Sequence, residues 1–149
     1  MNLASKGQAM AKQIIISSDY KPSDEEPFMS DRQRVYFRQK LIRWKEDILR
    51  EAKDTIMALQ AENENHPDIA DRASSETDRA IELRARDRQR KLISKIDSAI
   101  ARIDEGSYGF CEETGEPISL RRLEARPIAT LSIEAQERHE RNERVFRDD

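Results

Sequence analysis

The chain has 149 residues, enough for one domain, but 38% of them are charged against about 25% in an average soluble domain, so little of it can form a core. The formal net charge of -3 and a pI near 5.6 argue against a general nucleic-acid binder, which needs a basic surface, so we expect a protein partner.

Three features of the sequence point to a cytoplasmic protein. No apolar run approaches the roughly 20 residues needed to span a bilayer, so we expect no membrane segment. The stretch from Met1 to Gln13 lacks the apolar region of a signal peptide. A single cysteine, Cys111, excludes an internal disulfide and gives no sign of an oxidising compartment.

The first 29 residues contain turn formers such as Pro22 and Pro27, and we interpret them as an N-terminal arm. Ser30 followed by Gln33 is typical of a capping box, which predicts that a long helix begins there. Apolar residues then recur at heptad spacing, as in the seam of a coiled coil. The stripe consists of Val35, Ile42, Leu49 and Ile56, with Leu41, Ile48, Ala52 and Leu59 beside it.

Pro67 predicts that this helix ends near Asn63 to Asn65, and the helical pattern resumes beyond Ala73. A second stripe, ending at the stop signal Gly106, consists of Ile81, Ala85, Leu92, Ile96, Ala99 and Ile103. Neither stripe can be buried alone, so residues 30–105 are expected to form a long antiparallel coiled-coil hairpin with its tip at residues 66–73.

Residues 106–149 are expected to form a small zinc-finger-like knuckle and a C-terminal helix from Ile133 to Phe146, packed with the N-terminal arm as one globular region. The candidate core residues of the knuckle are Phe110, Ile118, Leu120, Leu123, Ile128 and Leu131, with Leu131, Ile133 and Ala135 packing the last helix against it. The predicted fold class is therefore mainly α.

The knuckle has the spacing of a four-cysteine zinc site, but the four positions are Cys111, Thr114, Ser132 and Ala135. Only one of them forms a thiolate, and His139 would add at most a second ligand. We therefore expect no zinc and no other metal, with Cys111 acting as a small buried apolar residue. No partner makes Cys111 a nucleophile, and we identify no catalytic residue.

Two other groups of residues leave alternatives open. Asp68 and Asp71 at the tip either present two carboxylates in one direction or cap the returning helix. A basic run is either a solvated coiled-coil face or a site for a phosphate-bearing ligand or an acidic protein. It consists of Arg84, Arg86, Arg88, Arg90, Lys91 and Lys95, with Arg121, Arg122 and Arg126 in the knuckle.

From about Met29 to Glu140 the chain resembles the DksA group of the DksA/TraR family of transcription factors. The resemblance is densest in three segments, Pro67-Asp68-Ile69-Ala70-Asp71-Arg72-Ala73, Glu82-Leu83-Arg84-Ala85-Arg86-Asp87-Arg88 and Arg121-Arg122-Leu123-Glu124-Ala125-Arg126-Pro127. The chain departs from the usual four-cysteine pattern and is similar to single-cysteine members.

The resemblance implies a protein that is not an enzyme and that binds bacterial RNA polymerase in its secondary channel without contacting DNA. The family's tip motif falls on Asp68, Asp71 and Ala73, which would be the effector residues near the catalytic centre. Such factors destabilise open complexes, repress ribosomal RNA promoters and activate some amino-acid biosynthesis promoters.

The resemblance also implies that guanosine tetraphosphate, ppGpp, binds at the interface with the polymerase rim helices during the stringent response. The matching positions are Leu92, Lys95 and Arg126, with Arg88 nearby. Gln136 replaces a lysine of the family pattern, which suggests a weaker or altered response. We expect a monomer. Two other functions remain open: a Gre-like transcript-cleavage factor whose tip acids hold magnesium, and a structural coiled-coil adaptor or homodimer.

Overall fold

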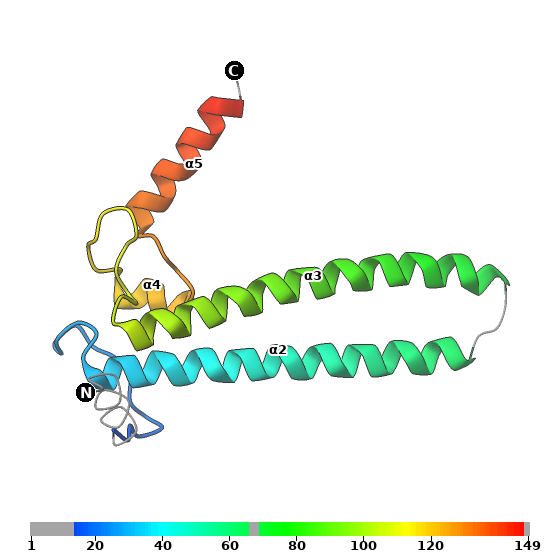
Figure 1. Cartoon of the computed structure of the whole chain (residues 1–149), viewed down its shortest axis with the longest axis horizontal. Coiled ribbons are helices and arrows are strands. Elements are labelled where there is room, and N and C mark those ends of the chain that lie inside the picture. The colour runs from blue at the N-terminus through cyan, green and yellow to red at the C-terminus, as the bar shows by residue number, and fades with distance from the viewer. Residues whose placement is uncertain (1–13, 66–68, 148–149) are drawn as a thin grey trace, which may run out of the picture. The chain divides into compact units, whose positions relative to one another are not determined.

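The structure is a computed structural model that describes residues 14–65 and 69–147, with side chains described for residues 14–61 and 76–146. Its elements are the helices α2 (Asp31–Asn65), α3 (Ile69–Glu105), α4 (Leu120–Ala125) and α5 (Ile133–Arg147), shown in Figure 1. Over the described residues there is no strand, only an isolated bridge between Phe110 and Pro117. The prediction of a mainly α fold is confirmed.

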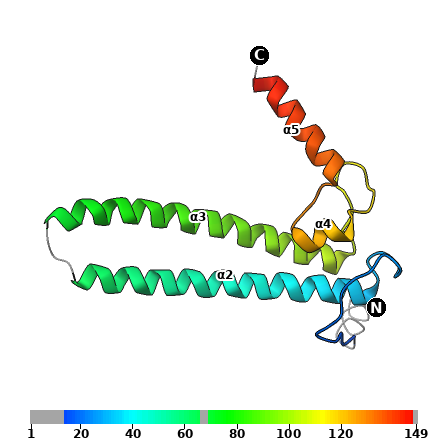
Figure 2. The ribbon, with the colours of Figure 1, turned by 180° about the vertical axis from the view of Figure 1, so that it is seen from behind.

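The chain divides into two compact units. Unit 1 comprises Met1–Leu41 and Ala99–Asp149, and unit 2 comprises Ile42–Ser98. In unit 2 the helices α2 and α3 run side by side in opposite directions, as both views show (Figures 1 and 2). This antiparallel pair is the predicted helical hairpin. Among the described residues, no helix is both long enough and apolar enough to cross a membrane.

The start of α2 is held by the two side chains that the capping box predicted, but one of them has a different partner. Ser30 Oγ accepts the N–H of Gln33 at 3.4 Å, as expected. Gln33 Oε1 accepts the N–H of Met29 at 2.8 Å, because the N–H of Ser30 already donates to the carbonyl of Pro27 at 3.1 Å. The fully buried Gln33 also donates to the carbonyl of Ser23 at 3.2 Å and so ties the arm to the helix.

The buried seam of unit 2 follows only part of the predicted stripes. Ile48 on α2 and Ile96 on α3 are 6% and 0% exposed, whereas Leu49 and Ile81 are 50% and 58% exposed. Leu49 follows Ile48 by one residue, a rotation of about 100° around the helix axis, so it lies on the flank of the seam. The predictions that Leu49, Ile81 and Ala85, which is also exposed, lie in the seam are wrong.

The ends of the long helices agree in part with the sequence signals. α2 ends at Asn65 as predicted, but α3 begins at Ile69, before Ala73 rather than beyond it. No glycine or proline lies between Ile69 and Ala73, so nothing in this stretch opposes a helix. At its other end α3 stops at Gly106, whose φ of 88° suits glycine and whose N–H donates to the carbonyl of Arg102 at 2.9 Å.

Unit 1 has its core between α2 and the knuckle. Phe37, Leu41, Ile118 and Leu123 are all fully buried. Leu120, Ile128 and Leu131 are half-buried. Two predicted contributors are exposed: Phe110 is 38% exposed and meets Phe28 edge to face at 5.4 Å, and Ile133 is 51% exposed. Ala135, two residues later on α5, is fully buried, as predicted. The predictions for Phe110 and Ile133 are therefore wrong.

Candidate functional site

The predicted effector tip falls outside what the structure describes. Asp68 is outside the described residues, and so are the side chains of Asp71 and Ala73, whose backbone belongs to the first turns of α3. The roles of these three residues stay predictions.

A basic face on α3 carries three of the predicted interface residues, all in unit 2. Arg88 and Lys95 are exposed and seven residues apart, so they share one face of the helix, with Leu92 half-buried between them. The neighbouring Arg86 is neutralised by Glu82 at 2.7 Å. Arg88 and Lys95 have no ion-pair partner among the described residues, so their charges are available to a ligand.

Arg126, the fourth predicted interface residue, belongs to unit 1 and follows the short helix α4 directly. Its N–H caps the helix by donating to the carbonyl of Arg122 at 2.7 Å, and its side chain is exposed. The guanidinium of Arg122 already has a partner inside the protein, since its Nε donates to the carbonyl of Leu131 at 2.9 Å. Gln136, where the resemblance implies a lysine, donates to Glu140 at 3.3 Å.

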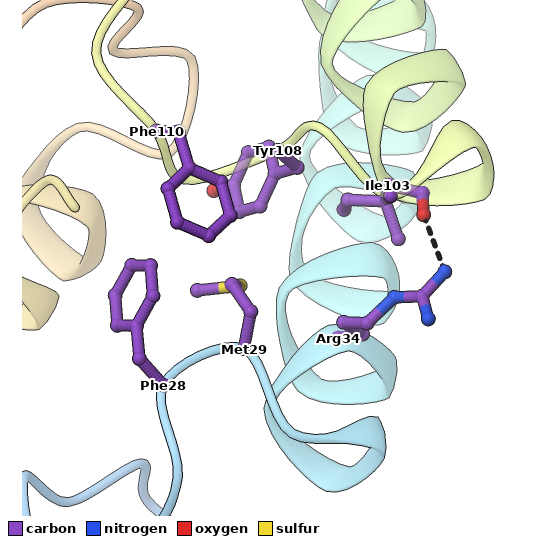
Figure 3. Close-up of a pocket in the computed structure, with 7 residues that line it drawn as sticks. Phe28, Met29, Arg34, Ile103, Tyr108 and Phe110 are labelled. Carbon is purple, nitrogen blue, oxygen red and sulfur yellow. Dashed lines mark hydrogen bonds between the residues drawn. The ribbon is translucent and has the colours of Figure 1, made fainter. Parts of the chain in front are cut away.

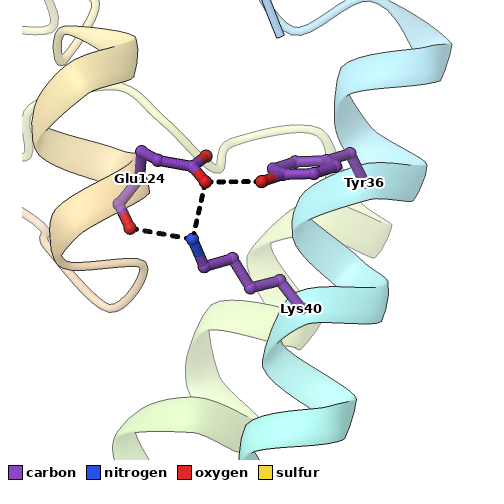
Figure 4. A network of polar contacts seen from close by, with 3 residues as sticks. All are labelled: Tyr36, Lys40 and Glu124. Atoms are coloured by element: carbon purple, nitrogen blue, oxygen red, sulfur yellow. Dashed lines mark hydrogen bonds and ion pairs between the residues drawn. The ribbon is translucent and has the colours of Figure 1, made fainter. Parts of the chain in front are cut away.

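A polar network that the sequence did not indicate joins α4 to α2 (Figure 4). We call it the Glu124 clasp, and it consists of Tyr36, Lys40 and Glu124. Lys40 Nζ donates to both the carboxylate and the backbone carbonyl of Glu124, each at 2.9 Å. The hydroxyl of Tyr36 donates to the same carboxylate oxygen at 2.5 Å. The clasp therefore fixes the last turn of α4 on the surface of α2.

The clasp shifts the protonation of its members. Burial acts to raise the pKa of Glu124, but the hydrogen bonds from Tyr36 and Lys40 and the nearby charge of Lys21 favour the carboxylate and lower the pKa overall. Burial, together with the hydrogen bond to Glu124 and its charge, raises the pKa of Tyr36 to about 12. At neutral pH the clasp thus holds a charged carboxylate and a neutral phenol.

The structure brings the four predicted zinc-ligand positions together, since Thr114 and Ser132 lie at Cys111 and the N–H of Ala135 donates to Ser132 Oγ at 3.2 Å. Cys111 is 2% exposed, and its sulfur is hydrogen-bonded by the hydroxyl of Thr114 and by the backbone of Ser132, Thr114 and Glu113. Burial acts to raise the pKa of the Cys111 thiol, but these hydrogen bonds lower it to about 6. Cys111 is buried, as predicted, and the hydrogen bonds around its sulfur favour the thiolate form. Ala135 is fully buried.

His139 adds nothing to this group, because its ring nitrogen Nε2 contacts the carboxylate of Glu113. The sequence allowed His139 as a second zinc ligand beside Cys111.

A cavity of about 200 Å³ lies in unit 1 at the end of α3 (Figure 3). Aromatic and aliphatic side chains form most of its wall, and the guanidinium of Arg34 is its charged group. The lining residues are Phe28, Met29, Arg34, Ile103, Gly106, Tyr108 and Phe110. Met29 and Phe28 come from the N-terminal arm, so heptad spacing and motif spacing could not have found this cavity.

Two family descriptions match the chain. Residues 33–103 match "DnaK suppressor protein DksA, N-terminal domain", and residues 106–141 match "Prokaryotic dksA/traR C4-type zinc finger". The first range spans parts of both α2 and α3, and the second spans the knuckle and part of α5.

The second match corrects our expectation that no metal belongs to the knuckle, because a C4-type zinc finger implies zinc. The residues of this chain do not fit a four-cysteine site, since Cys111 is its one cysteine and Thr114, Ser132 and Ala135 stand at the other positions. Within the described ranges no group of three or more His, Cys, Asp or Glu side chains is placed to hold a metal ion. Cys111 is thus the one cysteine ligand that the chain offers to the zinc of this family.

The relatives are similar over most of their length. The chain is 71% identical to "RNA polymerase-binding transcription factor DksA" of Caulobacter vibrioides, over 91% of this chain and 96% of that one. It is 39% identical to the protein of the same name in Escherichia coli, over 81% and 82%. The solved structure of transcription factor DksA2 from Pseudomonas aeruginosa matches with a TM-score of 0.74 and 40% identity, covering 92% and 98%. The chain therefore belongs to the DksA family, whose two domains it carries in order.

Proposed function

We propose that this protein binds bacterial RNA polymerase and regulates transcription, without enzymatic activity and without contacting DNA. The observation that carries the proposal is the 71% identity, across 91% of the chain, to a relative named as an RNA polymerase-binding transcription factor. The net charge of -3 supports it, since a protein surface and not DNA is the natural partner of such a chain.

The antiparallel helices of unit 2 support insertion into the secondary channel of the polymerase. α2 has 35 residues, which at a rise of about 1.5 Å per residue gives a helix of roughly 50 Å. We propose that the tip, with Asp68, Asp71 and Ala73 as effector residues, approaches the catalytic centre and destabilises open complexes. Ribosomal RNA promoters would be repressed and some amino-acid biosynthesis promoters activated.

We further propose that ppGpp binds at the interface with the polymerase rim helices through Arg88, Leu92, Lys95 and Arg126, which would make the protein part of the stringent response. The support is chemical. Arg88, Lys95 and Arg126 are exposed and without ion-pair partners among the described residues, and cations of this kind bind phosphate groups. Gln136 supplies no charge, so we propose a weaker response than in a member with lysine there.

The remaining features follow from this function. We propose a monomer in the cytoplasm, where the polymerase acts. We also propose three parts: an N-terminal arm over residues 1–29, a hairpin over residues 30–105, and a knuckle with its C-terminal helix over residues 106–149.

The test is transcription in vitro from a ribosomal RNA promoter with purified polymerase. We expect the wild type to inhibit, and Asp71→Asn to lose most of the inhibition while still binding polymerase. Asp78→Asn is the matched control, because it removes the same charge from an exposed position on the same helix and should inhibit as the wild type does. Full inhibition by Asp71→Asn at unchanged binding would contradict the role of the tip.

Two further measurements separate the alternatives. Adding ppGpp should deepen inhibition by the wild type and do so less for Arg126→Ala and Lys95→Ala. Backtracked complexes incubated with the protein and magnesium should yield no shortened RNA, whereas cleavage that depends on Asp71 would establish a Gre-like factor instead.

A further inference from the structure

The backbone on either side of Arg126 is held by side chains from other parts of unit 1. On one side, Lys40 Nζ of α2 donates to the carbonyl of Glu124 at 2.9 Å (Figure 4). On the other, the hydroxyl of Tyr108 donates to the carbonyl of Pro127 at 2.7 Å. The carbonyls of Glu124 and Pro127, which lie before and after Arg126 in the chain, are thus both held by hydrogen bonds.

Both anchoring side chains are themselves held in place. Lys40 also binds the carboxylate of Glu124 at 2.9 Å, where Tyr36 is the second donor. Tyr108 is 2% exposed, and its ring centroid lies 5.7 Å from that of the fully buried Phe37. Each anchor thus has a second contact besides the carbonyl that it binds, and a donor held in this way loses less freedom when it binds.

The peptide groups of Arg126 are also engaged, while its guanidinium is not. Its N–H donates to the carbonyl of Arg122 at 2.7 Å, and its carbonyl accepts the N–H of Ala129 at 3.0 Å. The side chain is exposed and makes no hydrogen bond or ion pair within the described part of the chain. Arg126 is therefore a free cation on a fixed stretch of backbone.

We propose that Lys40 and Tyr108 are positioning residues, which preorganise Arg126 for an oxyanion of a phosphate-bearing ligand. The inference rests on the proposed function, in which that ligand is ppGpp. A guanidinium binds phosphate through paired, directional N–H donors, so its affinity depends on where its backbone holds it. Neither positioning residue touches the ligand; each acts through the carbonyl that it binds.

The experiment measures the inhibition of transcription in vitro as ppGpp is titrated, with Lys40→Met, Tyr108→Phe and Arg126→Ala. Lys45→Met is the matched control, because Lys45 lies on the same helix, has nearly the same exposure, 35% against 33%, and pairs with Asp97 at 2.7 Å instead of with α4. Two quantities are read for each protein: inhibition without the nucleotide, and the nucleotide concentration that gives half of its full effect.

We expect Lys40→Met and Tyr108→Phe each to raise the half-effect concentration about 3- to 10-fold, and Arg126→Ala to raise it more. Inhibition without the nucleotide should stay at the wild-type level for both positioning variants, and Lys45→Met should change neither quantity. In the Arg126→Ala background, Lys40→Met should add nothing, because its effect passes through Arg126.

Each contrary result has its own meaning. If Arg126→Ala raises the half-effect concentration while Lys40→Met and Tyr108→Phe do not, the positioning role is overturned and the proposed function stands. If Arg126→Ala changes nothing, the nucleotide role of Arg126 fails and the inference fails with it. If the positioning variants lower inhibition with and without nucleotide alike, alongside a lower melting temperature, their role is in stability alone and the inference is again overturned.

Discussion

The guanidinium of Arg34, near the start of α2, donates a hydrogen bond of 2.7 Å to the carbonyl of Ile103, near the end of α3 (Figure 3). Carbonyls in the last turn of a helix have no partner inside that helix. Ile103 is 2% exposed, so little water reaches this residue. Arg34 thus adds a charged donor to a carbonyl that the N–H of Gly106 also reaches, at 3.2 Å.

Replacing Arg34 should therefore destabilise unit 1. We expect Arg34→Met to lower the free energy of unfolding by about 1–3 kcal/mol, since a charged donor to a poorly solvated carbonyl is lost. Urea unfolding followed by circular dichroism measures this. The control Arg50→Met removes a guanidinium that is 70% exposed and 3.5 Å from Asp47, and should cost less than about 0.5 kcal/mol. Equal losses would show that the bond to Ile103 contributes nothing.

The uneven seam of unit 2 predicts opposite outcomes for two isoleucines of α3. Ile96 is fully buried, so Ile96→Ala should cost about 2–5 kcal/mol through lost burial and a new cavity. Ile81 is 58% exposed, so Ile81→Ala should stay within about 0.5 kcal/mol of the wild type. Thermal and urea unfolding of the two variants give the comparison. If Ile81→Ala lowered the free energy of unfolding by as much as Ile96→Ala, Ile81 would belong to the seam.

Local signals in the sequence predicted the helical hairpin well. Ser30, Pro67 and Gly106 act on the backbone next to them, and α2 and α3 end at Asn65 and Glu105 as these signals require. Heptad counting did less well within the helices. Leu49 fits an apolar repeat but lies one residue beside the buried Ile48, and a shift of one residue cannot be resolved without the partner helix.

Contacts between distant residues were beyond reach of the sequence. Lys40 and Glu124 are 84 residues apart, and the one local sign of the clasp is that Tyr36 and Lys40 share a face of α2. The hydrogen bonds to the sulfur of Cys111 were missed for a related reason. Backbone N–H groups that stabilise a sulfur come from the path of the loop, which residue types do not reveal.

Gly109 has a φ of 90°, and a side chain there would meet the N-terminal arm. An added Cβ would lie 3.1 Å from Met29 Cγ and 3.2 Å from Phe28 Cζ. We expect Gly109→Ala to lower the free energy of unfolding by about 2–4 kcal/mol, from backbone strain and displaced side chains together. Gly115→Ala is the control for strain alone, because φ is 73° and no atom lies within 4 Å of the new Cβ. Similar losses in the two variants would mean that the arm does not pack on Gly109.

The charge of Glu124 makes the stability of unit 1 depend on pH. Its pKa is held below the ordinary 4.5, so the clasp contributes its full stability above about pH 4.5 and loses it as pH falls through the lowered pKa. Glu124→Gln keeps the size of the side chain but removes this titration. The difference in unfolding free energy between wild type and Glu124→Gln should be constant from neutral pH to about pH 5 and shrink at more acid pH. Glu143→Gln, at an exposed position on α5 and outside the clasp, is the control for the substitution itself. If this difference in unfolding free energy stayed constant down to about pH 2, the hydrogen bonds from Tyr36 and Lys40 would not stabilise the charged form of Glu124.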